Sequence, residues 1–173
     1  MRTSAFPSKV ETQMTRYNPD MKSLLPPQEI EHLFIAGWAA LQAGALSEAE
    51  EAFLGVLATD PDHADALNGL GTVAFHEKRL DEAEALHEKA YGIALKFYKG
   101  KKLPTHVDWG SAHDRTLLRA MHGQALVAFR RGDVKEAEKR FNAILKLNPK
   151  DNTGVRFLLA DIKKGRKSWD QNG

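Results

Sequence analysis

A chain of 173 residues with 42% hydrophobic and 28% charged residues is long enough for one domain with a single core. Its net charge of +2 creates no global field that would draw it onto nucleic acid or anionic lipid. The absence of cysteine excludes disulfides, thiolate zinc sites and cysteine nucleophiles.

The first residues of the chain form a proline-containing segment without sustained apolar periodicity. Residues 1–27 contain Pro7, Pro19, Pro26 and Pro27, and we predict a flexible N-terminal arm that ends where a helix begins. An alternative is that the arm docks in a groove of this molecule or of a neighbour through its apolar side chains, which are Tyr17, Met21, Leu24 and Leu25.

No segment of the chain reads as a membrane signal or span. The first residues lack the apolar core of a secretory signal, and the most apolar run, residues 34–46, is short and is interrupted by Gln42. We therefore expect a cytoplasmic protein without membrane insertion.

The next segment has the pattern of two helices joined by a turn. The first is predicted over residues 28–43, ending at Gly44, and the second is predicted to start near Ser47 as its cap and to stop before Asp60. Small residues at Gly37 and Ala49 would let the two helices approach closely, while Phe53 would fill the space against the following helices.

A second pair of helices follows, and its pattern runs past the expected stop. The period of apolar residues predicts a second helix reaching about Lys99. Gly100 then breaks the helix, and Ser111 with Asp114 three residues later is a capping signal for the next one. The insert, residues 98–117, is predicted to project with apolar side chains near its tip, namely Tyr98, Leu103, Val107 and Trp109.

The last part of the chain contains a third helix pair and a short final helix. Asp151 is predicted to cap a helix over residues 152–164, whose single apolar stripe suits the terminal cap of a repeat array. The tail, residues 165–173, is predicted to be frayed.

The three helix pairs share one pattern of small and large residues. Leu33, Ala36, Gly37, Ala40, Ala49, Phe53, Val56 and Pro61 recur as Leu67, Leu70, Gly71, Ala74, Ala83, His87, Ala90 and Leu95, and then as Met121, Gln124, Ala125, Ala128, Ala137, Phe141, Ile144 and Pro149. This spacing resembles the 34-residue tetratricopeptide repeat. It places repeats at residues 30–63, 64–97 and 118–151, in a single domain over residues 28–164.

The resemblance implies an all-α, right-handed α-solenoid of helix-turn-helix repeats with a C-terminal capping helix. It also implies a protein–protein interaction module, an adaptor or chaperone, whose first helices line a concave groove that binds a peptide segment of a partner. Residues at groove positions are Phe34, Trp38, Leu41, Asn68, Thr72, Phe75, His76, His122, Leu126, Phe129 and Arg130. Because many of these are apolar, we expect an apolar peptide as ligand.

Two subclasses of the family were compared with the first repeat. The subclass that grips a terminal carboxylate uses Lys and Asn where this chain has Phe34 and Trp38, so a carboxylate clamp is rejected. The first repeat is similar to that of class II chaperones of type III secretion, which bind translocator proteins through positions that are here Phe34, Trp38 and Leu41.

Other classes of function have weaker support in the sequence. No nucleophile with its base, paired acids or phosphate loop is present, so we expect no enzyme and no cofactor. His106 and His113 lack a specific metal-ligand spacing, so no metal is expected, and the lysines near Phe97 are interpreted as solvated and not as a nucleic-acid site. A self-assembling scaffold, using the insert or the arm to form a homo-oligomer, remains the alternative.

Overall fold

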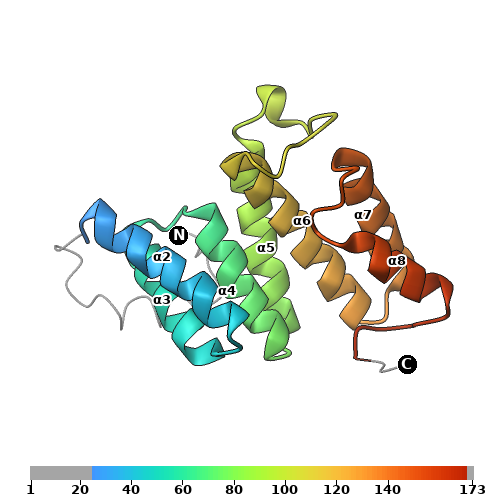
Figure 1. The fold of residues 1–173 in the computed structure, drawn as a ribbon, viewed down its shortest axis with the longest axis horizontal. Helices are drawn as coiled ribbons and strands as arrows, with labels where there is room; N and C mark the ends of the chain where they lie inside the picture. Colours follow the sequence, from blue (N-terminus) through green and yellow to red (C-terminus); the bar gives the residue numbers. More distant parts are fainter. Residues whose placement is uncertain (1–24, 171–173) are drawn as a thin grey trace, which may run out of the picture. The chain divides into compact units, whose positions relative to one another are not determined.

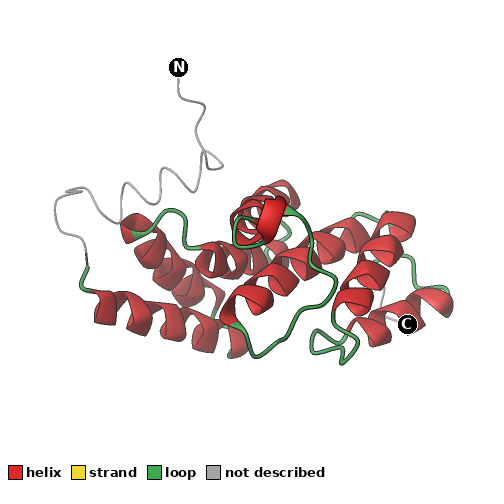
Figure 2. Ribbon diagram, turned by 90° about the horizontal axis from the view of Figure 1, so that it is seen from above, coloured by secondary structure: helices red, strands yellow, loops and turns green. Residues whose placement is uncertain are grey.

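The computed structural model describes residues 25–170 of the chain. This part is all helical, with connecting loops and no strand (Figures 1 and 2). The helices are α2 (Pro27–Gln42), α3 (Leu46–Thr59), α4 (Ala64–His76), α5 (Leu80–Leu95), α6 (Ala112–Arg130), α7 (Val134–Leu147) and α8 (Val155–Lys163), with a 3₁₀ helix, η1, at Lys99–Lys101.

The chain divides into two compact units, and the boundary falls within α5. Unit 1 comprises residues 1–89 and unit 2 comprises residues 90–173. The predicted N-terminal arm lies outside the described residues, except for its last three positions. Helices α2 to α4 and the first part of α5 therefore belong to unit 1, and the insert and the remaining helices belong to unit 2.

Prolines and a glycine fix the ends of α2. Pro26 is the N-cap and Pro27 is the first helical residue, where the missing N–H costs no hydrogen bond. Gly44 adopts a left-handed conformation with φ of 75° just after the helix, as a terminating glycine does. The predicted cap of α3 was wrong, because that helix begins at Leu46 with Ala45 as its N-cap, and Ser47 lies inside the first turn.

Unit 1 is held together by close helix packing around Phe53 of α3. This side chain is fully buried, and a Cβ added to Gly37 of α2 would lie 2.8 Å from its Cε1. A Cβ added to Gly69 of α4 would lie 2.3 Å from its Cζ. Two glycines on two different helices thus face one phenylalanine ring, which lets α2, α3 and α4 pack closely.

The helix that crosses into unit 2 is shorter than predicted. It ends at Leu95, four residues before the expected end at Lys99. The amides of Lys96, Phe97 and Tyr98 donate to carbonyls three residues earlier, which is a tightened 3₁₀ turn. Gly100 then adopts φ of 70°, as the predicted helix break requires.

The insert is tied back to the core of unit 2. The amide of Val107 donates to the carbonyl of Leu147 at 3.1 Å, and Nδ2 of Asn148 donates to the carbonyl of Val107. The side chain of Val107 is 1% exposed. Helix α6 begins after Ser111, whose hydroxyl accepts from the amide of Asp114, and this confirms the predicted capping signal.

The N-cap of the last helix is Gly154 and not Asp151 as predicted, although the Asp151 carboxylate accepts from the first amides of the helix. The helix begins at Val155, later than predicted, because residues 151–154 form a turn in which Asp151 and Gly154 both have positive φ. The carboxylate of Asp151 accepts from the amides of Val155 and Arg156 at 2.8 and 3.1 Å. The apolar stripe packs inward, with Val155 and Leu159 buried.

Candidate protein-binding surface

Helix α2 presents most of its apolar side chains at the surface of unit 1. Phe34, Trp38 and Leu41 are half-buried, and Gly37 is the helix's one fully buried residue. The ring of Phe34 lies 5.0 Å from that of His63, and the ring of Trp38 lies edge-on to Phe53 at 5.5 Å. These contacts hold the two aromatic rings while leaving part of each accessible.

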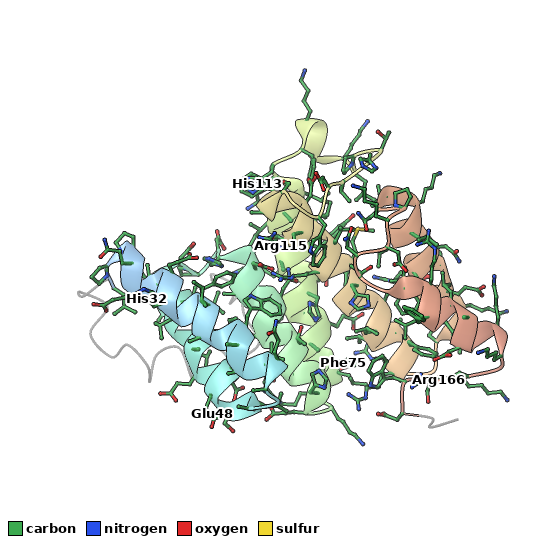
Figure 3. The ribbon with its side chains drawn as sticks, viewed as in Figure 1. His32, Glu48, Phe75, His113, Arg115 and Arg166 are labelled. Atoms are coloured by element: carbon green, nitrogen blue, oxygen red, sulfur yellow. The ribbon has the colours of Figure 1, made fainter. Side chains whose placement is uncertain are left out.

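Two of the four groove residues predicted on α4 are not accessible. Asn68 is fully buried, and its Oδ1 lies 3.2 Å from Nδ1 of His87, so its inclusion among ligand contacts was wrong. Phe75 is also buried in the core, near the carboxyl end of α4 (Figure 3). Thr72 is half-buried and donates its hydroxyl to the carbonyl of Asn68, while His76 is exposed.

The corresponding residues of α6 divide in the same way. Phe129 is fully buried and packs edge-on against Phe141, so it belongs to the core of unit 2 and not to a ligand surface. Leu126 is half-buried against that core. Arg130 is paired with Asp170, a residue that was predicted to lie in a frayed tail.

His122 is a titratable residue whose pKa is strongly shifted by its surroundings. Its Nε2 atom is buried and has no hydrogen-bond partner. Burial lowers the pKa of His122 to about 4, because a charged imidazolium would be poorly solvated, and the carboxylate of Asp151 opposes this in part. The imidazole is therefore neutral at pH 7.

The predicted second surface on the insert is largely absorbed into unit 2. Val107 is buried, and Trp109 is half-buried with the guanidinium of Arg119 5.7 Å from its ring. Tyr98 is half-buried, and its hydroxyl donates to Asp114. Of the four predicted side chains only Leu103 is exposed, because the loop folds back onto α7.

Three large apolar side chains outside the predicted site residues are exposed. Ile35 of α2 is 55% exposed, Phe97 is 62% exposed, and Phe157 of α8 is 78% exposed. Phe97 stacks on the ring of His113 at 4.0 Å between centroids, at the amino end of α6 (Figure 3). Ile35 and Phe157 lie outside the apolar stripe of their amphipathic helices, and this position in the sequence could have predicted their exposure.

Neither a metal-binding cluster nor a membrane-spanning helix occurs in residues 25–170. This part of the chain contains no cluster of three or more His, Asp or Glu side chains that could hold a metal ion. None of its helices combines the length and apolarity needed to cross a bilayer.

The first two helix pairs of this chain match a known repeat family. Residues 31–95 match the model of the tetratricopeptide repeat family. This chain contains tetratricopeptide repeats. The predicted fold class, an all-α solenoid of such repeats, is confirmed by the seven described helices and by the similar solved structure reported next.

Two known proteins resemble this chain. Cellulose synthase operon protein C of Komagataeibacter xylinus is 32% identical over 133 residues, which cover 74% of this chain and 9% of that protein. The solved structure of the first tetratricopeptide domain of Spaghetti (RPAP3), bound to the HSP90 peptide SRMEEVD, has a TM-score of 0.58 and 18% identity, covering 82% of this chain and 95% of that one. The second likeness concerns the fold alone.

Proposed function

We propose that this chain is a protein–protein interaction module that holds an apolar segment of a partner against α2. The observation that carries the proposal is a difference between equivalent helices. In α4 ten residues are buried, whereas in α2 only Gly37 is. Since α2 is rich in apolar residues, this leaves an apolar surface for a partner to cover.

The side chains on α2 are suited to anchor a ligand. Phe34 and Trp38 are large aromatic residues, the type that contributes most to binding energy at interfaces. Their rings rest on His63 and Phe53 and so lose little conformational entropy when a ligand binds. Leu41 continues the same stripe, one turn further along.

The chemistry of the surface favours an apolar ligand over a charged one. Phe34 and Trp38 occupy positions where a carboxylate clamp would need polar or cationic side chains, and Ile35 extends the apolar area. That a protein of similar fold binds a peptide supports peptide binding in general. A translocator-type ligand, as in the chaperone alternative, would use the same three side chains, which are Phe34, Trp38 and Leu41.

A second candidate function is self-assembly. Two large apolar residues, Ile35 on α2 and Phe157 on α8, are more than half exposed. Burying such side chains against another copy would remove apolar surface from contact with water, which favours association. In that case the partner is the same chain, and the mass in solution depends on concentration.

Affinity capture from native extract tests the binding proposal. We compare wild type with Trp38→Glu plus Leu41→Glu and with Ile35→Glu, each checked for helical content and mass. The matched control is Ala85→Glu, because Ala85 is an exposed alanine of α5 in the same unit. A protein captured by wild type and the control, and lost in the α2 variants, is the expected result.

The other results separate the alternatives. If the α2 variants capture the same proteins as wild type, the α2 surface is not the binding site. If wild type captures only its own chain, and the mass falls on dilution and in Ile35→Glu, self-assembly replaces the proposal.

A further inference from the structure

The segment after α8 folds back onto the carboxyl end of α6 within unit 2. Residues 166–170 leave the helix at Gly165, which has φ of 96°, and return toward the carboxyl end of α6 (Figure 1). The predicted fraying of the tail is thus wrong for this segment. Its contacts are specific and involve one aromatic and one acidic residue of the tail, Trp169 and Asp170.

The acidic residue makes a two-pronged contact with Arg130. Nε of Arg130 donates to Oδ2 of Asp170 at 2.9 Å, and Nη2 donates to Oδ1. Such paired hydrogen bonds recognise the planar carboxylate group. The Arg130 side chain is 8% exposed and that of Asp170 is 46% exposed, so the fold supplies the buried cation and the tail brings the anion to it.

A second arginine holds the aromatic residue. Nη1 of Arg166 donates to Oδ2 of Asp161 at 3.0 Å, which fixes its guanidinium at the end of α8 (Figure 3). This guanidinium lies 5.7 Å from the ring of Phe129 and 5.6 Å from that of Trp169. It also donates to the backbone carbonyl of Trp169, so both ring and backbone of this residue are recognised.

We propose that Arg130 and Arg166, the latter held over the buried ring of Phe129, form a second peptide-binding site, which recognises an aromatic residue followed by an acidic one. Trp169 and Asp170 occupy it as an intramolecular ligand. A partner segment with the same chemistry competes with the tail for the site. The inference rests on the proposed protein-binding function, but it concerns unit 2 and a different ligand chemistry from that of α2.

Because the tail is attached to the protein, it competes strongly with a partner segment for the site and lowers the partner's apparent affinity. A segment only a few residues from its site has an effective concentration in the millimolar range. A partner binds only the fraction of molecules in which the tail is released, so its apparent affinity is lowered by that fraction. Weakening the tail contacts is therefore expected to tighten partner binding by about tenfold or more.

Fluorescence polarisation with a labelled peptide tests the site in the full chain. The probe is the protein's own tail sequence, Lys-Ser-Trp-Asp-Gln-Asn-Gly, and the control probe has Asn in place of Asp. The proteins are wild type, the opened variant Trp169→Ala plus Asp170→Ala, and that variant with Arg130→Met added. We expect the opened variant to bind the probe at least tenfold more tightly than wild type, with loss on Arg130→Met and with the control probe.

Two results would overturn the inference. One is equal affinity of wild type and the opened variant for the probe, with both proteins folded by circular dichroism. The other is undiminished binding after Arg130→Met. Adding Ile35→Glu to the opened variant keeps the two proposals separate, because that change affects the α2 surface and is expected to leave probe binding intact.

Discussion

The ring of Phe53 lies in the space that a side chain on Gly69 would occupy, since a Cβ there would be 2.3 Å from Cζ of Phe53. The ring is fully buried and cannot move aside cheaply. We expect Gly69→Ala to lower the free energy of unfolding by about 1–3 kcal/mol or more through overpacking, measured by urea denaturation.

A matched glycine provides the control. Gly92 of α5 is exposed, and an added Cβ would meet nothing within 4 Å. Gly92→Ala is therefore expected to stabilise the protein by about 0.5–1 kcal/mol, because alanine is the better helix former. The combination of Gly69→Ala with Phe53→Leu should cost less than the sum of the single changes. Strict additivity would contradict the proposed contact.

The buried pair formed by Asn68 and His87 yields a second prediction. The amide oxygen of Asn68 can only accept, so Nδ1 of His87 carries the proton. His87→Phe restores a large apolar residue but removes this hydrogen bond, and we expect a loss of about 1–3 kcal/mol in thermal or urea unfolding.

A double-mutant cycle checks this explanation. Replacing both partners, with His87→Phe and Asn68→Leu, leaves no buried polar group of the pair unsatisfied and should recover much of the loss. If the double variant is as unstable as the sum of the two single variants, the hydrogen bond is not the cause.

The insert depends on one carboxylate. Asp114 accepts from the hydroxyl of Tyr98 and from the amide of Asp108, the latter at 2.8 Å. We expect Asp114→Asn to lower stability by about 1–2 kcal/mol, and Tyr98→Phe by less, because hydrogen bonds to a charged acceptor are stronger than average. Trypsin should then cleave faster near Lys102, which is exposed.

The control for the insert is Leu103→Ala. Leu103 is 44% exposed, so this change should alter stability by less than about 0.5 kcal/mol and leave the cleavage rate unchanged. If trypsin cleaves Asp114→Asn no faster than wild type, the insert is held by other contacts.

The lowered pKa of His122 predicts a loss of stability in acid. Burial lowers its pKa to about 4, whereas an unfolded histidine titrates near 6.5. Between these values the unfolded chain binds the extra proton, so the free energy of unfolding falls as the pH falls. From pH 7 to pH 4.5 the loss from this group is on the order of 2–3 kcal/mol.

His122→Gln isolates this contribution from that of the carboxylates. The variant cannot take up the proton, so its stability should fall less than that of wild type between pH 7 and pH 4.5, as measured by urea denaturation at each pH. An identical fall in both proteins would mean that the folded protein accommodates the charged imidazole.

The sequence by itself determined the fold class and most helix ends. The recurrence of small residues such as Gly37 and Gly71 opposite large ones, and breaks at Gly44 and Gly100, are local signals that act through backbone conformation and helix packing. Such signals need only neighbouring residues, and the errors at Ser47, Lys99 and Asn152 are shifts of a few residues at helix ends.

The tertiary structure alone decided which side chains a partner can reach. Leu41 and Phe75 occupy equivalent positions of the repeat, yet Phe75 is buried and Leu41 is half-buried. Burial depends on which segments pack over a residue, and these segments are distant in sequence. Asp170 forms an ion pair with Arg130, and the backbone of Val107 is hydrogen-bonded to Leu147 and Asn148. The spacing of apolar residues predicts which face of a helix is apolar. Whether other segments cover that face is decided by the packing of the folded chain.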